Sequence, residues 1–132
     1  MGQTSGPNSG VDGASSGRAI VIHPVLPGAR NDAGRTAEAS LEEAVGLSRA
    51  ISLDIAEARC VRVSRPQPST LIGEGALEEL SSVVAATEAG LVVVDATLSP
   101  VQQRNLERRW KTKVIDRTGL ILEIFGERAR TR

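Results

Sequence analysis

The chain has 132 residues, of which 40% are hydrophobic and 24% charged, and its formal net charge is zero. This length is typical of one domain, and the sequence holds no apolar run of about 18 residues, which excludes a membrane-spanning helix. One cysteine and one histidine exclude an internal disulfide framework and a zinc site of the usual His/Cys type. No secretory signal is evident, and a lone cysteine fits a reducing cytoplasm, so we expect a cytoplasmic protein.

The chain divides into a tail and a folded domain. Residues 1–17 are rich in Gly, Ser, Asn and Pro and bury too little apolar surface to offset their ordering entropy. We therefore predict a disordered tail over 1–17 and a single domain over 18–132.

The first half of the predicted domain alternates strands with helices. The apolar run Ala19–Ile22 predicts a strand covered on both faces, which ends at His23-Pro24. The helix that follows is capped by Thr36 or, alternatively, by Ser40, and extends to about Leu53. A second strand is predicted over residues 58–63.

Gly73-Glu74-Gly75 is predicted to form a turn that leads into the next helix, which ends at Gly90. The run Leu91–Asp95 predicts a third strand. Ser99-Pro100 starts a further helix, because Ser caps free N–H groups and Pro suits the first helical position. That helix extends to about Trp110.

A fourth strand is predicted over Lys113–Asp116. The segment after it fits either a hairpin strand over 120–125 or a helix, and we prefer the helix. Its predicted buried face consists of Ile121, Ile124, Phe125 and Ala129. Four strands interleaved with helices predict an α/β fold, with a four-stranded, mostly parallel sheet flanked by helices and built from βαβ crossovers.

No residue pattern in the chain predicts catalysis. The sequence contains no G-x-x-x-x-G-K-[ST] motif, and Glu78 stands where the dinucleotide fingerprint needs a small residue. His23 and Cys60 are interpreted as structural residues. Asp95 ends a central strand, at the edge where open parallel sheets bind ligands, so a nucleotide-binding edge near Gly73, Gly75 and Asp95 is an alternative hypothesis.

Positive charge gathers in the last quarter of the chain. Residues 1–100 hold 7 basic and 12 acidic residues, whereas residues 101–132 hold 9 basic and 4 acidic ones. Arg104 and Arg108 share one helix face, and cations on a short helix suit the RNA backbone. The predicted phosphate contacts are Arg104, Arg108, Arg109, Lys111, Lys113 and Arg117. The alternative is that Arg104 and Arg117 pair with acidic residues inside the fold.

Two segments carry a resemblance to a known family. Residues 95–107 follow the pattern D-x-x-L-S-P-x-Q-x-R-N-L-E, and residues 116–125 follow D-R-T-x-L-I-L-x-I-F. Together with Leu71–Gly75, which matches an I-G-x-G turn, they make residues 18–132 resemble the N-terminal domain of HflX-type GTP-binding proteins. One departure is Ala76, where the family usually has Lys, so a phosphate contact by that Lys has no counterpart here.

The resemblance implies a cytoplasmic, translation-associated GTPase that binds the large ribosomal subunit and splits or rescues stalled ribosomes. Its N-terminal α/β domain would contact ribosomal RNA, and a helical linker would lead to a GTPase domain that binds GTP and Mg²⁺. On this interpretation the chain lacks the GTPase domain, has no catalytic residue and binds no cofactor or metal itself. An alternative is a module that packs on its own GTPase domain and regulates it.

Overall fold

The computed structural model describes residues 17–26 and 36–130, and the side chains of residues 127–130 lie outside the described part. The tail predicted over 1–17 falls outside the described residues except for Gly17, whose carbonyl accepts a hydrogen bond from Asp54 N at 2.9 Å.

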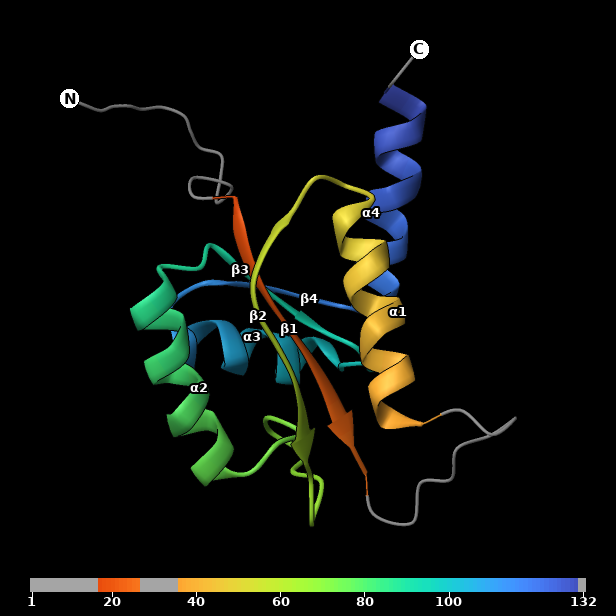
Figure 1. The fold of residues 1–132 in the computed structure, drawn as a ribbon. Helices are drawn as coiled ribbons and strands as arrows, with labels where there is room; N and C mark the ends of the chain where they lie inside the picture. Colours follow the sequence, from red (N-terminus) through yellow and green to blue (C-terminus); the bar gives the residue numbers. More distant parts are fainter. Residues whose placement is uncertain (1–16, 27–35, 131–132) are drawn as a thin grey trace, which may run out of the picture.

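Strands and helices alternate throughout the described part of the chain (Figure 1). In chain order they are β1 (Arg18–Val25), α1 (Ala37–Arg49), β2 (Asp54–Arg62), α2 (Glu74–Thr87), β3 (Leu91–Val94), α3 (Pro100–Trp110), β4 (Lys113–Asp116) and α4 (Arg117–Arg130). Within these residues, no helix has the length and hydropathy needed to span a bilayer.

The four strands form one sheet in the order β2-β1-β3-β4, and every neighbouring pair is parallel. The chain moves outward from β1 to β2, then crosses back over β1 to reach β3 and β4. Because of this reversal, α1 and α4 cover one face of the sheet and α2 and α3 cover the other (Figure 1). The predicted α/β class is confirmed.

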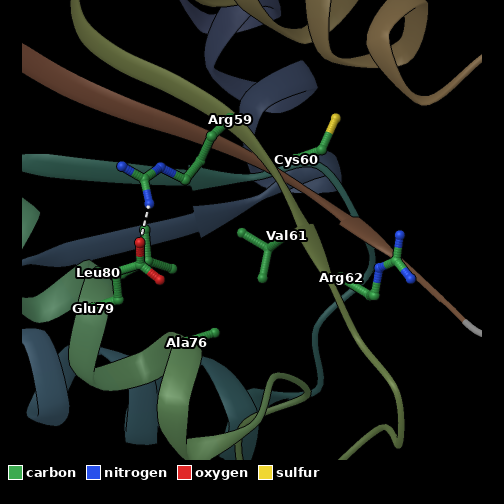
Figure 2. A pocket seen from close by; sticks show the side chains of 7 residues that line it. All are labelled: Arg59, Cys60, Val61, Arg62, Ala76, Glu79 and Leu80. Atoms are coloured by element: carbon green, nitrogen blue, oxygen red, sulfur yellow. Dashed lines mark hydrogen bonds and ion pairs between the residues drawn. The ribbon is translucent and has the colours of Figure 1, made fainter.

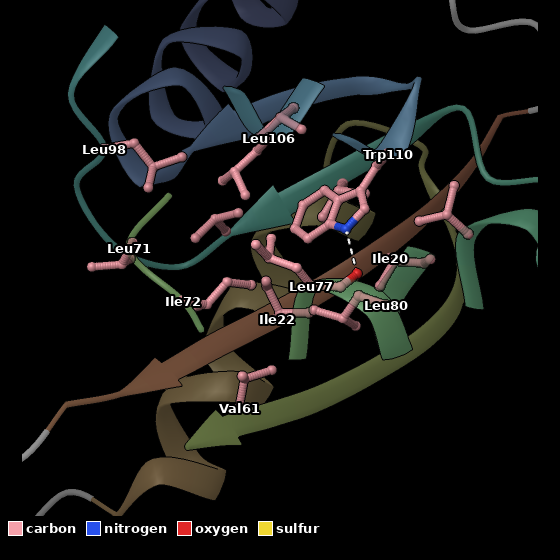
Figure 3. Close-up of a cluster of buried hydrophobic side chains, with 14 of the residues drawn as sticks. Ile20, Ile22, Val61, Leu71, Ile72, Leu77, Leu80, Leu98, Leu106 and Trp110 are labelled. Carbon is pink, nitrogen blue, oxygen red and sulfur yellow. Dashed lines mark hydrogen bonds between the residues drawn. The ribbon is translucent and has the colours of Figure 1, made fainter. Parts of the chain in front are cut away.

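Each face of the sheet has its own apolar core. Alternate strand residues point to opposite faces, so Ile20 and Ile22 pack with α2 and α3, whereas Val21 packs with α1 and α4. Figure 3 shows the larger core, in which Trp110 from α3 lies close to Leu77 from α2. Aliphatic packing on both faces explains why the central strands are continuous apolar runs.

β1 is longer than predicted, because it continues through His23 and Pro24 to Val25. Along β1, the N–H and C=O groups of successive residues point alternately toward β2 and toward β3. The backbone groups of Ile22 point toward β3, because its carbonyl accepts a hydrogen bond from the chain that follows β3. The nitrogen of Pro24 faces the same side, beyond the last residue pair with β3. Its missing N–H therefore breaks no ladder bond.

Other element boundaries also differ from the predictions. β2 starts at Asp54, four residues before the predicted strand. Thr36 caps α1, since its hydroxyl oxygen accepts from Ala39 N at 3.0 Å, so the alternative cap Ser40 is wrong. Gly75 lies inside α2, and Gly73 is its N-cap residue rather than part of a turn. That helix ends at Thr87, and its C-cap Glu88 takes the left-handed conformation, so the predicted end at Gly90 is too late.

The last segment is a helix, as preferred, but it packs through a different face. Leu120 is buried and Ile124 half-buried, whereas Ile121 and Phe125 are 37% and 62% exposed. The cause lies at Gly119, where an added Cβ would lie 3.3 Å from Ile115. This close approach turns the Gly119–Leu120 side of α4 toward the sheet. The predicted burial of Ile121 and Phe125 is wrong, and Ala129 lies outside the described side chains.

Candidate functional site

α3 is the element that carries most of the predicted contact residues. Its N-terminus is fixed by a capping box: the Ser99 hydroxyl accepts from Gln102 N at 3.1 Å, and Ser99 N donates to Gln102 Oε1 at 2.9 Å. Its buried side holds Leu106 and Trp110, and the indole N–H of Trp110 donates to the carbonyl of Leu77 at 3.1 Å. The first turn and one face of α3 are thereby held in place.

The opposite face of α3 is basic. Arg104 and Arg108 lie four residues apart on this face, and Lys111 is the left-handed residue that ends the helix; we call these three residues the α3 stripe. All three are exposed, and within the described part of the chain none forms an ion pair or side-chain hydrogen bond. Lys113, which begins the edge strand β4, is also exposed and unpaired within the same residues. Their charge is therefore available to a ligand.

Arg109 lies off this row and is engaged. Its guanidinium donates to Glu74 Oε1 at 3.1 Å and makes a second, shorter contact with Glu74 Oε2. The hydrogen bond from Arg109 holds the pKa of Glu74 below its usual 4.5, and Glu74 raises the pKa of Arg109 in turn. Glu74 thus balances the charge of Arg109.

Arg117 belongs to a polar cluster at the carboxyl ends of the strands. Its guanidinium donates to Asp95 Oδ1 at 2.7 Å and lies 3.9 Å from Glu43 Oε1. His23 Nδ1 lies 2.9 Å from the other oxygen of Asp95, whose side chain is only 1% exposed. The alternative interpretation, that Arg117 pairs with an acidic residue inside the fold, is confirmed for Asp95.

This cluster occupies the point where strand order reverses, between β1 and β3, the usual ligand position in open α/β sheets. The buried carboxylate of Asp95 joins β1, the loop after β3 and α4. Asp116, at the end of β4, accepts from Leu98 N at 3.1 Å and from Gly119 N at 2.9 Å. Both carboxylates therefore hold loops and helix starts together.

The glycines of the proposed nucleotide edge flank Glu74, whose side chain contacts another part of the molecule. Glu74, between Gly73 and Gly75, reaches Arg109 near the end of α3, whereas Asp95 contacts His23 and Arg117. These contacts do not join the three residues, and the nucleotide edge stays a prediction.

A cavity of about 290 Å³ lies between β2 and α2 (Figure 2). Arg59 at its side donates to Glu57 Oε2 at 2.9 Å and to Glu79 Oε2 at 3.0 Å, so its charge is balanced. Cys60 points away from this space in Figure 2, and burial raises the pKa of its thiol. Ala76 lines the cavity, so the position where the resembled family usually has Lys contributes no cation.

Sequence reasoning missed two amides on α3. Gln102 Nε2 donates to Gln67 O at 3.1 Å, and Asn105 Nδ2 donates to Ser69 O at 2.9 Å. The two amides lie three residues apart, so they share one flank of the helix, between its buried and exposed faces. Amides in this position are the sequence signal for hydrogen bonds to a neighbouring segment. Both bonds reach the chain between β2 and α2.

The described residues form a small three-layer α/β domain, in which α3 carries exposed basic residues on one face. A family model described as "GTP-binding GTPase N-terminal" matches residues 38–126. The chain therefore belongs to this family, the N-terminal domains of HflX-type GTP-binding proteins.

Curated relatives support this assignment and are much longer. GTPase HflX of Magnetococcus marinus is 41% identical over 115 residues, which cover 87% of this chain and 26% of the relative. GTPase HflX of Escherichia coli is 54% identical over 66 residues, which cover 50% of this chain and 16% of the relative. The chain thus spans about a quarter or less of these relatives.

Solved structures share the fold. The crystal structure of SsGBP with GDP matches with a TM-score of 0.61 at 19% identity, over 87% of this chain and 30% of that one. A GTP-binding protein from the archaeon Sulfolobus solfataricus, in complex with GDP, matches with a TM-score of 0.57 over 83% of this chain and 30% of its own. At this identity the likeness shows the fold alone.

Proposed function

We propose that this chain is the RNA-docking domain of an HflX-type GTPase and binds the large ribosomal subunit through the α3 stripe and Lys113. The observation that carries the proposal is the group of three exposed cations, two on α3 and one at its C-cap, which are unpaired within the described residues. In a full-length protein, a separate GTPase domain would bind GTP and Mg²⁺ and act in ribosome splitting or rescue in the cytoplasm.

The side chains on α3 favour contact with phosphates over contact with bases. Base recognition in unpaired RNA relies on exposed aromatic rings, but Trp110 is buried and its N–H is engaged by Leu77. Arginine and lysine side chains recognise the phosphate backbone by charge and hydrogen bonding. We therefore expect binding that depends on salt and hardly on base sequence.

The six predicted cations contribute unequally under this proposal. Arg104, Arg108, Lys111 and Lys113 offer charge without losing a partner in the described structure. Arg109 and Arg117 already pair with Glu74 and Asp95. An RNA phosphate would have to share each arginine with its carboxylate or displace that carboxylate. We expect the weaker contacts from these two.

The double variant Arg104→Ala/Arg108→Ala tests the proposal. Each phosphate contact contributes about 0.7–0.9 to the slope of log affinity against log salt concentration. Loss of two contacts should lower the slope by about 1.5 and weaken binding about 20-fold at 0.15 M salt. The measurement is co-sedimentation with purified large ribosomal subunits over a series of salt concentrations.

The control is Arg18→Ala/Arg49→Ala, which changes the net charge equally but lies at the start of β1 and the end of α1. We expect its slope to match that of the unaltered chain, and circular dichroism verifies that both variants are folded. Equal affinity and slope for the Arg104/Arg108 variant and the unaltered chain would overturn the docking function.

A further inference from the structure

The chain between β2 and α2 has little regular structure but is linked by several hydrogen bonds. We call residues 64–70 the β2–α2 loop. Pro66 and Pro68 restrict its backbone, and Gln67 exchanges two backbone hydrogen bonds with Leu71, at 2.8 and 3.1 Å. The side chain of Gln67 also donates to the carbonyl of Arg65 at 3.1 Å. These hydrogen bonds make the loop fold back on itself.

Leu71 anchors the end of this loop at a cost. Its φ of 72° lies in the left-handed region, which strains a residue with a bulky side chain. Its side chain is nevertheless buried in the core beside Ile72. Burial of the Leu71 side chain offsets the backbone strain and anchors this end of the loop in the core.

The loop is fastened to the helix that carries the α3 stripe. Asn105 donates to the carbonyl of Ser69 at 2.9 Å, and Gln102 donates to the carbonyl of Gln67 at 3.1 Å. Asn105 lies three residues before Arg108 on α3, so the loop bonded to Asn105 lies on the flank next to the Arg108 side of the basic face. Surface loops positioned by a rigid scaffold are frequent binding elements, because less entropy is lost when they bind.

Arg65 gives this loop a charge. It is exposed, and within the described residues its side chain has neither an ion pair nor a hydrogen bond. Its backbone carbonyl is fixed by Gln67, so the base of the side chain is held within the loop. A cation on a loop that is hydrogen-bonded to the helix carrying Arg104 and Arg108 would extend the surface that an RNA backbone meets.

We propose that the β2–α2 loop is a second element of the RNA interface, in which Arg65 binds a phosphate and Asn105 acts as the positioning residue. This inference rests on the docking function proposed above. Gln102 has the same role toward Gln67, but it also completes the capping box of α3. Asn105 is therefore the cleaner residue to change.

The test is a double-mutant cycle of Arg65→Ala and Asn105→Ala, with binding to large ribosomal subunits measured over a salt series. Arg65→Ala should weaken binding about five-fold at 0.15 M salt and lower the salt slope by about one. Arg65→Lys, which keeps the charge, should retain the slope. Asn105→Ala should weaken binding alone, yet have no further effect once Arg65 is Ala.

The outcomes separate this inference from the docking function. If Arg104→Ala/Arg108→Ala weakens binding while Arg65→Ala matches the control Arg49→Ala, the loop is not part of the interface and the docking function stands. If neither variant weakens binding, the docking function itself fails. A further loss from Asn105→Ala in the Arg65→Ala background would overturn the positioning role. Should Asn105→Ala not fold, Arg65→Ala and Arg65→Lys still decide whether the loop binds.

Discussion

Asp95 shows how one side chain organises the carboxyl edge of the sheet. A charge with 1% exposure is costly unless it is paired, and Asp95 has partners on both sides, His23 at 2.9 Å and Arg117 at 2.7 Å. These partners belong to β1 and α4, two elements that lie far apart in the sequence. The carboxylate therefore fixes the start of α4 relative to the centre of the sheet.

We predict that Asp95→Ala lowers the free energy of unfolding by about 2 kcal/mol, because it removes charge-assisted hydrogen bonds from His23 and Arg117. Arg117 is partly exposed, so water replaces some of the loss. The control Glu123→Ala removes an exposed carboxylate that is unpaired within the described residues, and should cost under about 0.5 kcal/mol. Urea unfolding measures both, and equal losses would contradict the role of Asp95.

The sequence predicts where Asp95 lies but not what it contacts. A buried strand that ends in Asp places the carboxylate at the ligand-binding edge of a parallel sheet. Its partners are 72 and 22 residues away in the chain, and only the strand order brings them together. The same limit applies to Arg109, because its pairing with Glu74 depends on how α2 and α3 pack.

At the scale of elements, α3 is the best predicted part of the molecule. Ser99 and Pro100 specify its start through local hydrogen bonds and backbone preference. The C-terminal ends of the helices are harder to predict from the sequence. Glu88 and Lys111 end α2 and α3 in the left-handed conformation with φ of 56° and 54°, and neither residue type predicts it.

We expect Ser99→Ala to lower the free energy of unfolding by about 1 kcal/mol, since the Gln102 backbone N–H loses its cap. Trp110 is the only tryptophan and lies buried at the other end of α3, so its fluorescence follows unfolding in urea. Ser64→Ala is the control, because Ser64 is exposed and has no side-chain hydrogen bond among the described residues. A loss no larger than that of the control would show that the cap contributes nothing.

At the scale of the whole molecule, the class of fold is predictable and the order of strands is not. Alternation of apolar strands with helices specifies a parallel sheet. Whether β3 adds beside β1 or beside β2 depends on which faces the helices cover. The reversal between β1 and β3 places α2 and α3 together on one face, and so creates the flank on which Asn105 meets the β2–α2 loop.

Variants of α4 test how this helix covers the sheet, because α4 carries apolar residues on more than one side. Leu120 is buried against the sheet, whereas Leu122 is 64% exposed. We predict that Leu120→Ala lowers the free energy of unfolding by about 2–4 kcal/mol, as expected for a core leucine, and that Leu122→Ala changes it by under about 0.5 kcal/mol.

Both changes replace leucine by alanine in one helix, so differences in helix propensity cancel. Urea unfolding followed by Trp110 fluorescence gives the comparison. Similar losses for both variants would mean that the sheet is covered by a different face of α4. The close approach of Gly119 to Ile115 would then no longer determine how the helix lies.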